Sequence, residues 1–429
     1  MTEREAELEE HLRALQAQID NLVERDEARR VRIIKLERDR ETLRVRLDQA
    51  KQGRFRRQNP ADEQHSRRTR YGEPGAGATP ESSPAPPPAV EVPGVGVIRE
   101  GEIRLKKEPR NLRVATIVDG FTATVLDPEF HASPISALTW ESDLEEADPE
   151  LLFVESAYRG VDGSWSTRVA RFGGPSEHLQ KVVEWCRSRS IPTVIWNKED
   201  PINFDWFLES ARLFDFVFTV DGDMIPRYRE ILGHGRVHLL QFFAQPAIHY
   251  PGPEEQRTGT VAFAGSYFAA KHPERREQIE VLLDPAREFG LHIFDRHGNT
   301  QDERFAWPEK YRPHIMGSLT YHQTVEAYRR YKVFLNVNTV TDSPTMCARR
   351  VFELAACGTP IISGVSRAMD HLASTGGVRS IEARQQTAAA LHDLLEEATT
   401  RLSLAESAER WVARGHLAAD RIDMVLSTV

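Results

Sequence analysis

Apolar side chains recur every three or four residues through the first fifty positions of the chain. Leucine and isoleucine form most of this stripe between Leu8 and Leu47, and no glycine or proline interrupts it before Gly53. A seven-residue repeat favours a left-handed coiled coil, because so narrow an apolar seam becomes stable only when it is buried against a partner helix. We therefore predict a coiled coil over residues 1–52 that assembles a homodimer or higher oligomer through residues 8–50. A single solvated helix is the alternative.

The stripe ends where proline, arginine and small polar residues take over, in residues 53–110. Such a composition buries too little apolar surface to offset the entropy that ordering removes. We predict a flexible linker over this range. Its arginines, from Arg54 to Arg70, could contact an anionic surface, although a solvated run of charge is the simpler interpretation.

From residue 111 onward, short runs of Val, Ile, Leu and Phe alternate with amphipathic stretches. Strands that are apolar on both faces and separated by helices are typical of parallel sheets covered on both sides. Two such series follow one another. We predict an α/β fold with two Rossmann-like domains (residues 111–250 and 251–429) that face each other across a cleft. The predicted strands are 112–118, 151–156, 191–196, 214–220, 236–242, 260–265, 291–295, 331–337, 359–364 and 378–382.

Composition and charge narrow the range of functions. The chain has 429 residues and a formal net charge of -9, so nucleic acid is a poor bulk partner. No apolar run approaches the roughly 20 residues of a membrane-spanning helix, and the N-terminus lacks the apolar segment of a secretory signal. Three cysteines fit a reducing compartment. We expect a cytoplasmic protein without a transmembrane segment.

The first strand of the second predicted domain ends at a turn suited to an anion. Gly265 and Ser266 follow the strand directly, and such a turn lets the backbone approach a phosphate at the start of the next helix. Lys271, Arg275 or Arg276 could add positive charge. An ordinary strand-to-helix turn with arginines on the helix surface is the alternative.

The stretch from Asn336 to Ser363 combines a strand, a polar loop, a helix and the next strand. Arg350 and Glu353 stand three positions apart in the helix and therefore share a face. The cation suits a diphosphate, and the carboxylate suits the two hydroxyls of a ribose. An internal ion pair of the helix is the alternative.

SPTMCARRVFELAACGTPIIS, within this stretch, resembles the donor-binding segment of GT-B glycosyltransferases, and more closely that of the spore maturation protein CgeB-like family. GSLTYHQTVEAYRRYKVFLNVN and VAFAGSYFAAKHPERREQI resemble neighbouring segments of the same family. The resemblance implies a glycosyltransferase that requires no cofactor or metal. It would move a sugar from a UDP-, GDP- or dTDP-sugar, with retention of configuration, to an unknown glycan, protein or metabolite.

Carried onto this sequence, the resemblance implies a set of donor contacts. They are Glu353 with the ribose; Gly265, Ser266, Lys271 and Arg350 with the diphosphate; Tyr321 near the nucleobase; and Asn338 or Asp342 with the sugar. Thr345 stands where many retaining enzymes carry a glutamate that grips the sugar. This departure leaves the sugar and the stereochemical outcome open.

The catalytic candidates come from the first predicted domain. Asp119 follows its first strand, and His131 lies shortly beyond. Glu199 and Asp200 follow the strand 191–196, at an acidic-Asp-Pro element that resembles one in the same family. We consider His131, Glu199 and Asp200 as candidates that orient or deprotonate an acceptor hydroxyl. A helix cap is the alternative for Asp200, since Pro201 is a good helix start.

Two other classes of function remain. Asp221 and Asp223 end a buried strand, as the Asp-x-Asp element of metal-dependent GT-A glycosyltransferases does, and carboxylate oxygens are suitable ligands for a divalent cation. A degenerate GT-B body assembled by the coiled coil could instead act as a non-catalytic binding scaffold. No other metal-ligand spacing is present in the sequence.

Overall fold

The structure is a computed structural model that describes residues 89–105, 107–171, 175–269, 271–298 and 302–429. The predicted coiled coil (1–52) and all but the last part of the predicted linker (53–110) lie outside the described residues. Assembly through residues 8–50 therefore stays a prediction.

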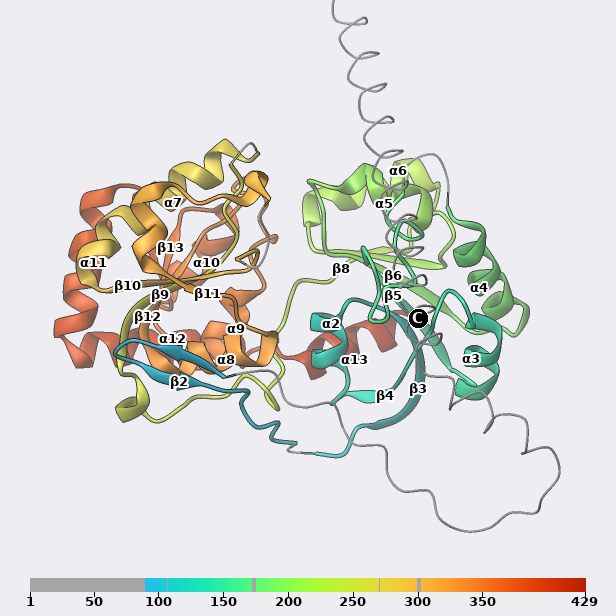
Figure 1. Ribbon diagram of the computed structural model, residues 1–429. Helices are drawn as coiled ribbons and strands as arrows, with labels where there is room; N and C mark the ends of the chain where they lie inside the picture. The colour runs from blue at the N-terminus through green and yellow to red at the C-terminus, as the bar shows by residue number, and fades with distance from the viewer. Residues whose placement is uncertain (1–88, 106, 172–174, 270, 299–301) are drawn as a thin grey trace, which may run out of the picture. The chain divides into compact units, whose positions relative to one another are not determined.

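The first half of the described chain builds a six-stranded sheet in the order β4-β3-β5-β6-β7-β8, and every neighbouring pair is parallel (Figure 1). Each residue of β5 and β6 is buried, as expected for a parallel sheet with helices on both faces. The strands are β3 (Arg110–Ile117), β4 (Phe130–Pro134), β5 (Leu151–Glu155), β6 (Thr193–Asn197), β7 (Phe216–Thr219) and β8 (Val237–Leu239). The helices are α2 (Gly120–Leu126), α3 (Trp140–Ala147), α4 (Glu177–Ser188), α5 (Phe204–Ala211) and α6 (Ile225–Leu232).

The second half builds another six-stranded parallel sheet, in the order β11-β10-β9-β12-β13-β14. Its strands are β9 (Gly259–Gly265), β10 (Leu291–Asp295), β11 (Ile315–Gly317), β12 (Tyr331–Asn336), β13 (Ile361–Gly364) and β14 (Arg379–Ile381). Its helices are α7 (Pro273–Ala286), α8 (Tyr321–Arg330), α9 (Arg350–Ala356), α10 (Asp370–Ser374), α11 (Arg384–Glu396) and α12 (Ala398–Val412). Two Rossmann-like sheets confirm the predicted α/β fold of GT-B type. All the predicted strands are present, and β4 and β11 are additional.

Helix α4 illustrates how local sequence produces an element. Ser176 caps its N-terminus by accepting a hydrogen bond from the backbone N–H of Leu179. Its buried residues recur at helical spacing and pack against the first sheet (Leu179, Val182, Val183 and Cys186). Among the helices of the described ranges, none combines the length and the apolar character of a membrane span.

The prediction of a flexible linker is wrong for its last part, because residues 90–98 form an antiparallel hairpin. Strands β1 (Val90–Val92) and β2 (Gly96–Ile98) pair across a tight turn in which Gly94 and Gly96 adopt positive φ. Val92 and Ile98 are fully buried, and β2 contacts α8 of the second sheet. Val90, Val92 and Ile98 form one apolar face, which offsets the high proline and glycine content of the segment.

The last helix contacts the first sheet, although it lies far beyond the predicted domain boundary at residue 250. Helix α13 (Ala418–Thr428) belongs to the C-terminal range, yet it contacts the first strand of the first sheet. The Arg110 guanidinium binds the Asp423 carboxylate at 2.7 Å and the Ala419 carbonyl at 3.3 Å. Figure 1 shows α13 beside α2, among the elements of the first sheet.

Candidate functional site

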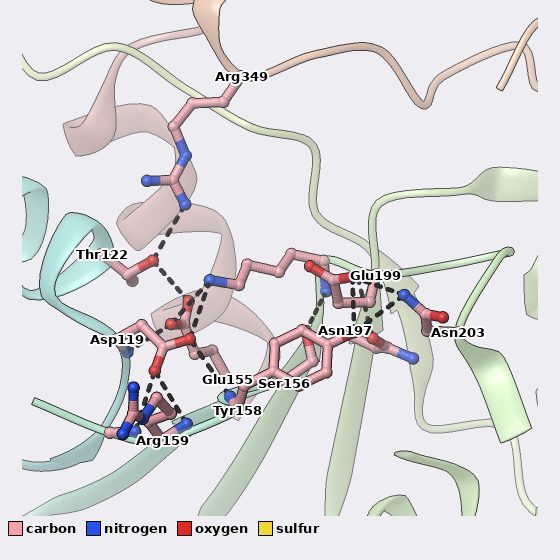
Figure 2. Close-up of polar contacts among 12 residues, drawn as sticks. Asp119, Thr122, Glu155, Ser156, Tyr158, Arg159, Asn197, Glu199, Asn203 and Arg349 are labelled. Atoms are coloured by element: carbon pink, nitrogen blue, oxygen red, sulfur yellow. Dashed lines mark hydrogen bonds and ion pairs between the residues drawn. The ribbon is translucent and has the colours of Figure 1, made fainter. Parts of the chain in front are cut away.

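Asp119, directly after β3, organises the carboxyl edge of the first sheet. Its carboxylate accepts hydrogen bonds from three consecutive backbone N–H groups, those of Tyr158, Arg159 and Gly160, at 2.9–3.3 Å (Figure 2). These residues belong to the loop that follows β5. Asp119 thus fixes the position of that loop through backbone contacts.

Glu155, the last residue of β5, is a fully buried carboxylate with three partners. It accepts hydrogen bonds from the Thr122 hydroxyl and from the backbone N–H of Asp119. Lys198 supplies the countercharge at 2.9 Å and also lies 3.9 Å from Asp119. Glu155 and Lys198 therefore form the internal framework of this edge.

Glu199, predicted as a catalytic candidate, lies at the surface of the same edge with two neighbours that sequence reasoning missed. One oxygen of its carboxylate, Oε2, accepts from the Tyr158 hydroxyl at 3.0 Å and from Asn203 Nδ2 at 2.8 Å. Asn203 also donates to the Tyr158 oxygen at 2.9 Å. Tyr158 follows the end of β5, so inspection of every strand end would have found it.

Neither of the other two catalytic candidates is exposed at this edge. Asp200 is fully buried, where Asn197 and the Thr219 hydroxyl bind its two oxygens, and burial raises its pKa to about 7. His131 is exposed at the start of β4, paired in register with Arg113. Ligands of parallel sheets bind at the opposite, carboxyl ends of the strands.

On the second sheet, the predicted turn is present, and of its three candidate cations Arg275, not Lys271, lies buried against it. Lys271 is exposed, whereas Arg275 on α7 is only 8% exposed and lies beneath the turn. Arg275 donates to the carbonyls of Ser266 and Val337 at 3.3 Å. Burial, and then the neighbouring Arg350, lower the pKa of Arg275 to about 9. The rotation of α7 decides which of its basic residues faces inward.

Three more arginines gather at this edge of the second sheet. Arg350 lies close to Gly265, where any Cβ atom would stand only 3.2 Å from its Nη2 atom. Arg296 follows β10, and its backbone N–H donates to the Gly265 carbonyl. Arg349 reaches toward the first sheet and donates to the Thr122 hydroxyl at 3.2 Å (Figure 2).

This group of Arg275, Arg296, Arg349 and Arg350, here called the arginine cluster, has no carboxylate partner. None of the four forms a salt bridge with a described residue. Arg275 Nε, Arg349 Nη1 and Arg350 Nη1 are buried without any hydrogen-bond acceptor in the described part of the chain. Buried guanidinium groups are normally paired, so the cluster lacks an anion of its own.

Glu353 lies on the same helix as Arg350, and its oxygens are engaged by other residues. It is 2% exposed and accepts hydrogen bonds from the Tyr321 hydroxyl at 2.7 Å and the Tyr328 hydroxyl at 3.0 Å. His249 Nδ1 accepts from the backbone of Gln245, which leaves the proton on Nε2, facing the Tyr321 oxygen at 3.1 Å. Burial lowers the pKa of His249 to about 4, so this imidazole is neutral and adds no countercharge.

The two residues expected to replace the missing sugar-gripping glutamate lie in different surroundings. Asn338 is buried, and its amide donates to the Ser363 hydroxyl and the Gly364 carbonyl. Asp342 is exposed and lines an open cavity of about 350 Å³, together with Asp221 and Glu274. The structure therefore commits Asn338 to an internal network and leaves Asp342 accessible.

Thr345 and Ser343 contact the first sheet through the Asp-x-Asp element. Ser343 donates to Asp221 Oδ1 at 2.6 Å, and Asp221 also caps the short 3-10 helix that follows it. Thr345 accepts from the backbone N–H of Gly222 at 2.8 Å and donates to the Val220 carbonyl at 2.9 Å. In the described ranges no three metal-ligating side chains gather in one place. The GT-A interpretation is wrong in its fold, and Asp221 serves instead as a contact between the two halves.

The site as a whole has two chemically different sides. The edge of the first sheet carries an oriented carboxylate at Glu199, and the edge of the second sheet carries the arginine cluster. Arg296 lies within electrostatic range of Glu199 and Asp119 as well as of Arg349 and Arg350, so the two sides face the same region. Such an arrangement can hold a polyanion on one side and a hydroxyl group on the other.

Comparison with known proteins gives one sequence match and several similar structures. Among solved structures, HepE of Anabaena in complex with UDP and glucose covers 74% of this chain and all of its own, with 11% identity and a TM-score of 0.46. A second match is an alpha,alpha-trehalose-phosphate synthase (UDP-forming) from Burkholderia vietnamiensis, with 12% identity and a TM-score of 0.42. The aligned region covers 68% of this chain and 74% of the synthase chain. No curated protein matches the sequence. Residues 270–427, which include most of the second sheet and all four members of the arginine cluster, match the family described as glycosyl transferase-like.

Proposed function

We propose that this protein is a GT-B glycosyltransferase whose arginine cluster binds the diphosphate of a nucleotide-sugar donor. The observation that carries the proposal is the set of buried guanidinium atoms without an acceptor, around a turn at Gly265 that brings the backbone close to the same place. A diphosphate supplies several acceptor oxygens and the missing negative charge. The glycosyl transferase-like match over residues 270–427 supports this assignment.

In this proposal the residues of the chain divide the work between the two sheets. The arginines neutralise the charge that develops on the departing nucleoside diphosphate, in the role that a metal ion plays in other transferases. Glu353, held by Tyr321 and Tyr328, orients the donor from the helix that carries Arg350. The acceptor approaches along the edge of the first sheet, where Glu199 faces its hydroxyl.

The proposal is tested by isothermal titration calorimetry of the full chain with UDP, GDP and dTDP. We expect one of the three to bind, and Arg350→Ala to weaken that binding at least about tenfold, the effect of losing one charge-assisted hydrogen bond. Absence of binding by all three would refute the donor site and favour the non-catalytic scaffold. Release of nucleoside diphosphate from the matching sugar donor then identifies the enzyme.

A further inference from the structure

Both hydrogen bonds to the Glu199 carboxylate end on one of its two oxygens, and the other oxygen has no described donor. Oε2 accepts both hydrogen bonds that Tyr158 and Asn203 donate, whereas no described residue donates to Oε1 (Figure 2). Glu199 is half-buried, and Oε1 is the oxygen left for a ligand. A carboxylate fixed in this way presents one acceptor position in a set direction, at little further cost in side-chain entropy.

The partners of Glu199 keep its orientation over a wide pH range. Burial, and then the charge of Glu199, raise the pKa of the Tyr158 phenol far above its usual value, so the hydroxyl remains a donor. Asn203 does not titrate. Oε1 is therefore an acceptor for a neutral O–H or N–H group, and it repels a phosphate or carboxylate placed against it.

The aromatic ring of Tyr158 adds an apolar surface beside this acceptor. The residue is 40% exposed although its ring packs edge-on against Phe207, with centroids 5.5 Å apart. The backbone contacts of Asp119 fix the loop that carries it. An exposed aromatic face next to a carboxylate and an amide matches a pyranose ring, which has C–H groups on its face and hydroxyls around its rim.

We infer that the acceptor is an uncharged carbohydrate, bound with its ring against Tyr158 and one hydroxyl donating to Glu199 Oε1. This inference rests on the proposed function, because the hydroxyl must lie beside a donor held by the arginine cluster. Tyr158 and Asn203 act as positioning residues for Glu199. A sugar phosphate is the opposing case, since Arg296 and Arg349 could receive its charge.

The experiment uses the full chain and the donor whose nucleotide binds by calorimetry. Release of nucleoside diphosphate is measured with methyl glycosides and disaccharides, and separately with the corresponding sugar 6-phosphates. We expect the neutral sugars to stimulate release about tenfold or more, and the phosphates to stimulate it less. Equal or stronger stimulation by the phosphates overturns the inference. A nucleotide that binds without any response to neutral sugars also overturns it, whereas failure of all nucleotides to bind overturns the proposed function.

Three variants link the effect to the named atoms. Glu199→Gln should lose most of the stimulation while its nucleotide Kd stays within about twofold, because the arginines are untouched. Tyr158→Phe keeps the ring but removes one of the two hydrogen bonds that hold Glu199, so KM for the sugar should rise while the nucleotide Kd is unchanged. Glu230→Gln, an exposed carboxylate on α6, is the matched control and should behave as wild type. Full stimulation in both Glu199→Gln and Tyr158→Phe would refute the assignment, and thermal unfolding shows whether each variant is folded.

Discussion

Replacing Arg275 by methionine tests whether this arginine binds a ligand or stabilises the fold. The pKa of Arg275 falls from 12.5 to about 9, which at 1.36 kcal/mol for each pH unit means that holding the charge costs the folded protein about 5 kcal/mol. Arg275→Met removes that cost. It also removes three long hydrogen bonds, to Ser266, Val337 and Thr339, worth about 1 kcal/mol each.

The two contributions predict an unusual outcome for a buried residue. Without nucleotide, Arg275→Met should unfold at an equal urea concentration or a higher one, corresponding to a gain of about 0–2 kcal/mol. With nucleotide, it should lose one charge-assisted interaction of about 1.5–3 kcal/mol, which raises Kd about 10- to 150-fold. Tryptophan fluorescence in urea measures the first effect, and calorimetry with the nucleoside diphosphate that binds wild type measures the second.

Arg257 is the matched control, because it is a buried arginine that is fully occupied. Its guanidinium donates to four backbone carbonyls, of Tyr328, Tyr331, Cys357 and Gly358, and to the Thr359 hydroxyl. Arg257→Met should therefore lower the free energy of unfolding by about 3 kcal/mol or more. If Arg275→Met is destabilised to the same degree and its nucleotide affinity is unchanged, Arg275 is structural and our reasoning about the cluster is wrong.

Three further changes test separate parts of the structure. Asp200 has a pKa of about 7 in the folded state, above its ordinary 3.8, so the folded protein binds one proton more than the unfolded chain between these pH values. The free energy of unfolding should therefore fall by about 3 kcal/mol as pH rises from 5 to 7.5. Asp200→Asn should remove that part of the pH dependence, measured as urea midpoints at both pH values, and an unchanged dependence would contradict the assignment. Thr345→Val should expose the Gly222 amide to faster hydrogen exchange and cost about 1–3 kcal/mol, because that amide loses its acceptor; unaltered protection would show that the contact is not maintained in solution. Ile98→Ala should cost about 2–5 kcal/mol in thermal or urea unfolding, since Ile98 is fully buried, whereas a residue in a flexible linker would cost nothing.

The fold was predictable because most of its strands have a recognisable pattern in the local sequence. Strands such as β5 and β12 are rich in Val, Leu and Phe, and the order of such strands along the chain is enough to indicate two parallel sheets. The hairpin at Val90–Ile98 was missed because its composition resembles a linker. Its alternating valines and the intervening glycines were nevertheless a hairpin signal.

The site was predictable only as far as strand ends determine it. Gly265, Arg350 and Glu199 lie at the expected edges because parallel strands bring their carboxyl ends together. The choice of Arg275 over Lys271 depends on how α7 rotates on its sheet, which the spacing of its basic residues does not specify. The engagement of Glu353 by Tyr321 and Tyr328, and of Thr345 by Gly222, depends on contacts between segments far apart in sequence, which no local pattern encodes.

The path of the chain between the two sheets has a consequence for its synthesis. The hairpin at Val90–Ile98 packs on the second sheet before β3 begins the first, and α13 returns to the first sheet after the second is finished. A ribosome therefore releases the hairpin about 160 residues before the sheet that buries it has started, and it releases the helix that contacts Arg110 only after both sheets. Neither half is complete until the other has been made. We expect fragments cut at the predicted boundary near residue 250 to require each other to fold, in contrast to two domains joined end to end.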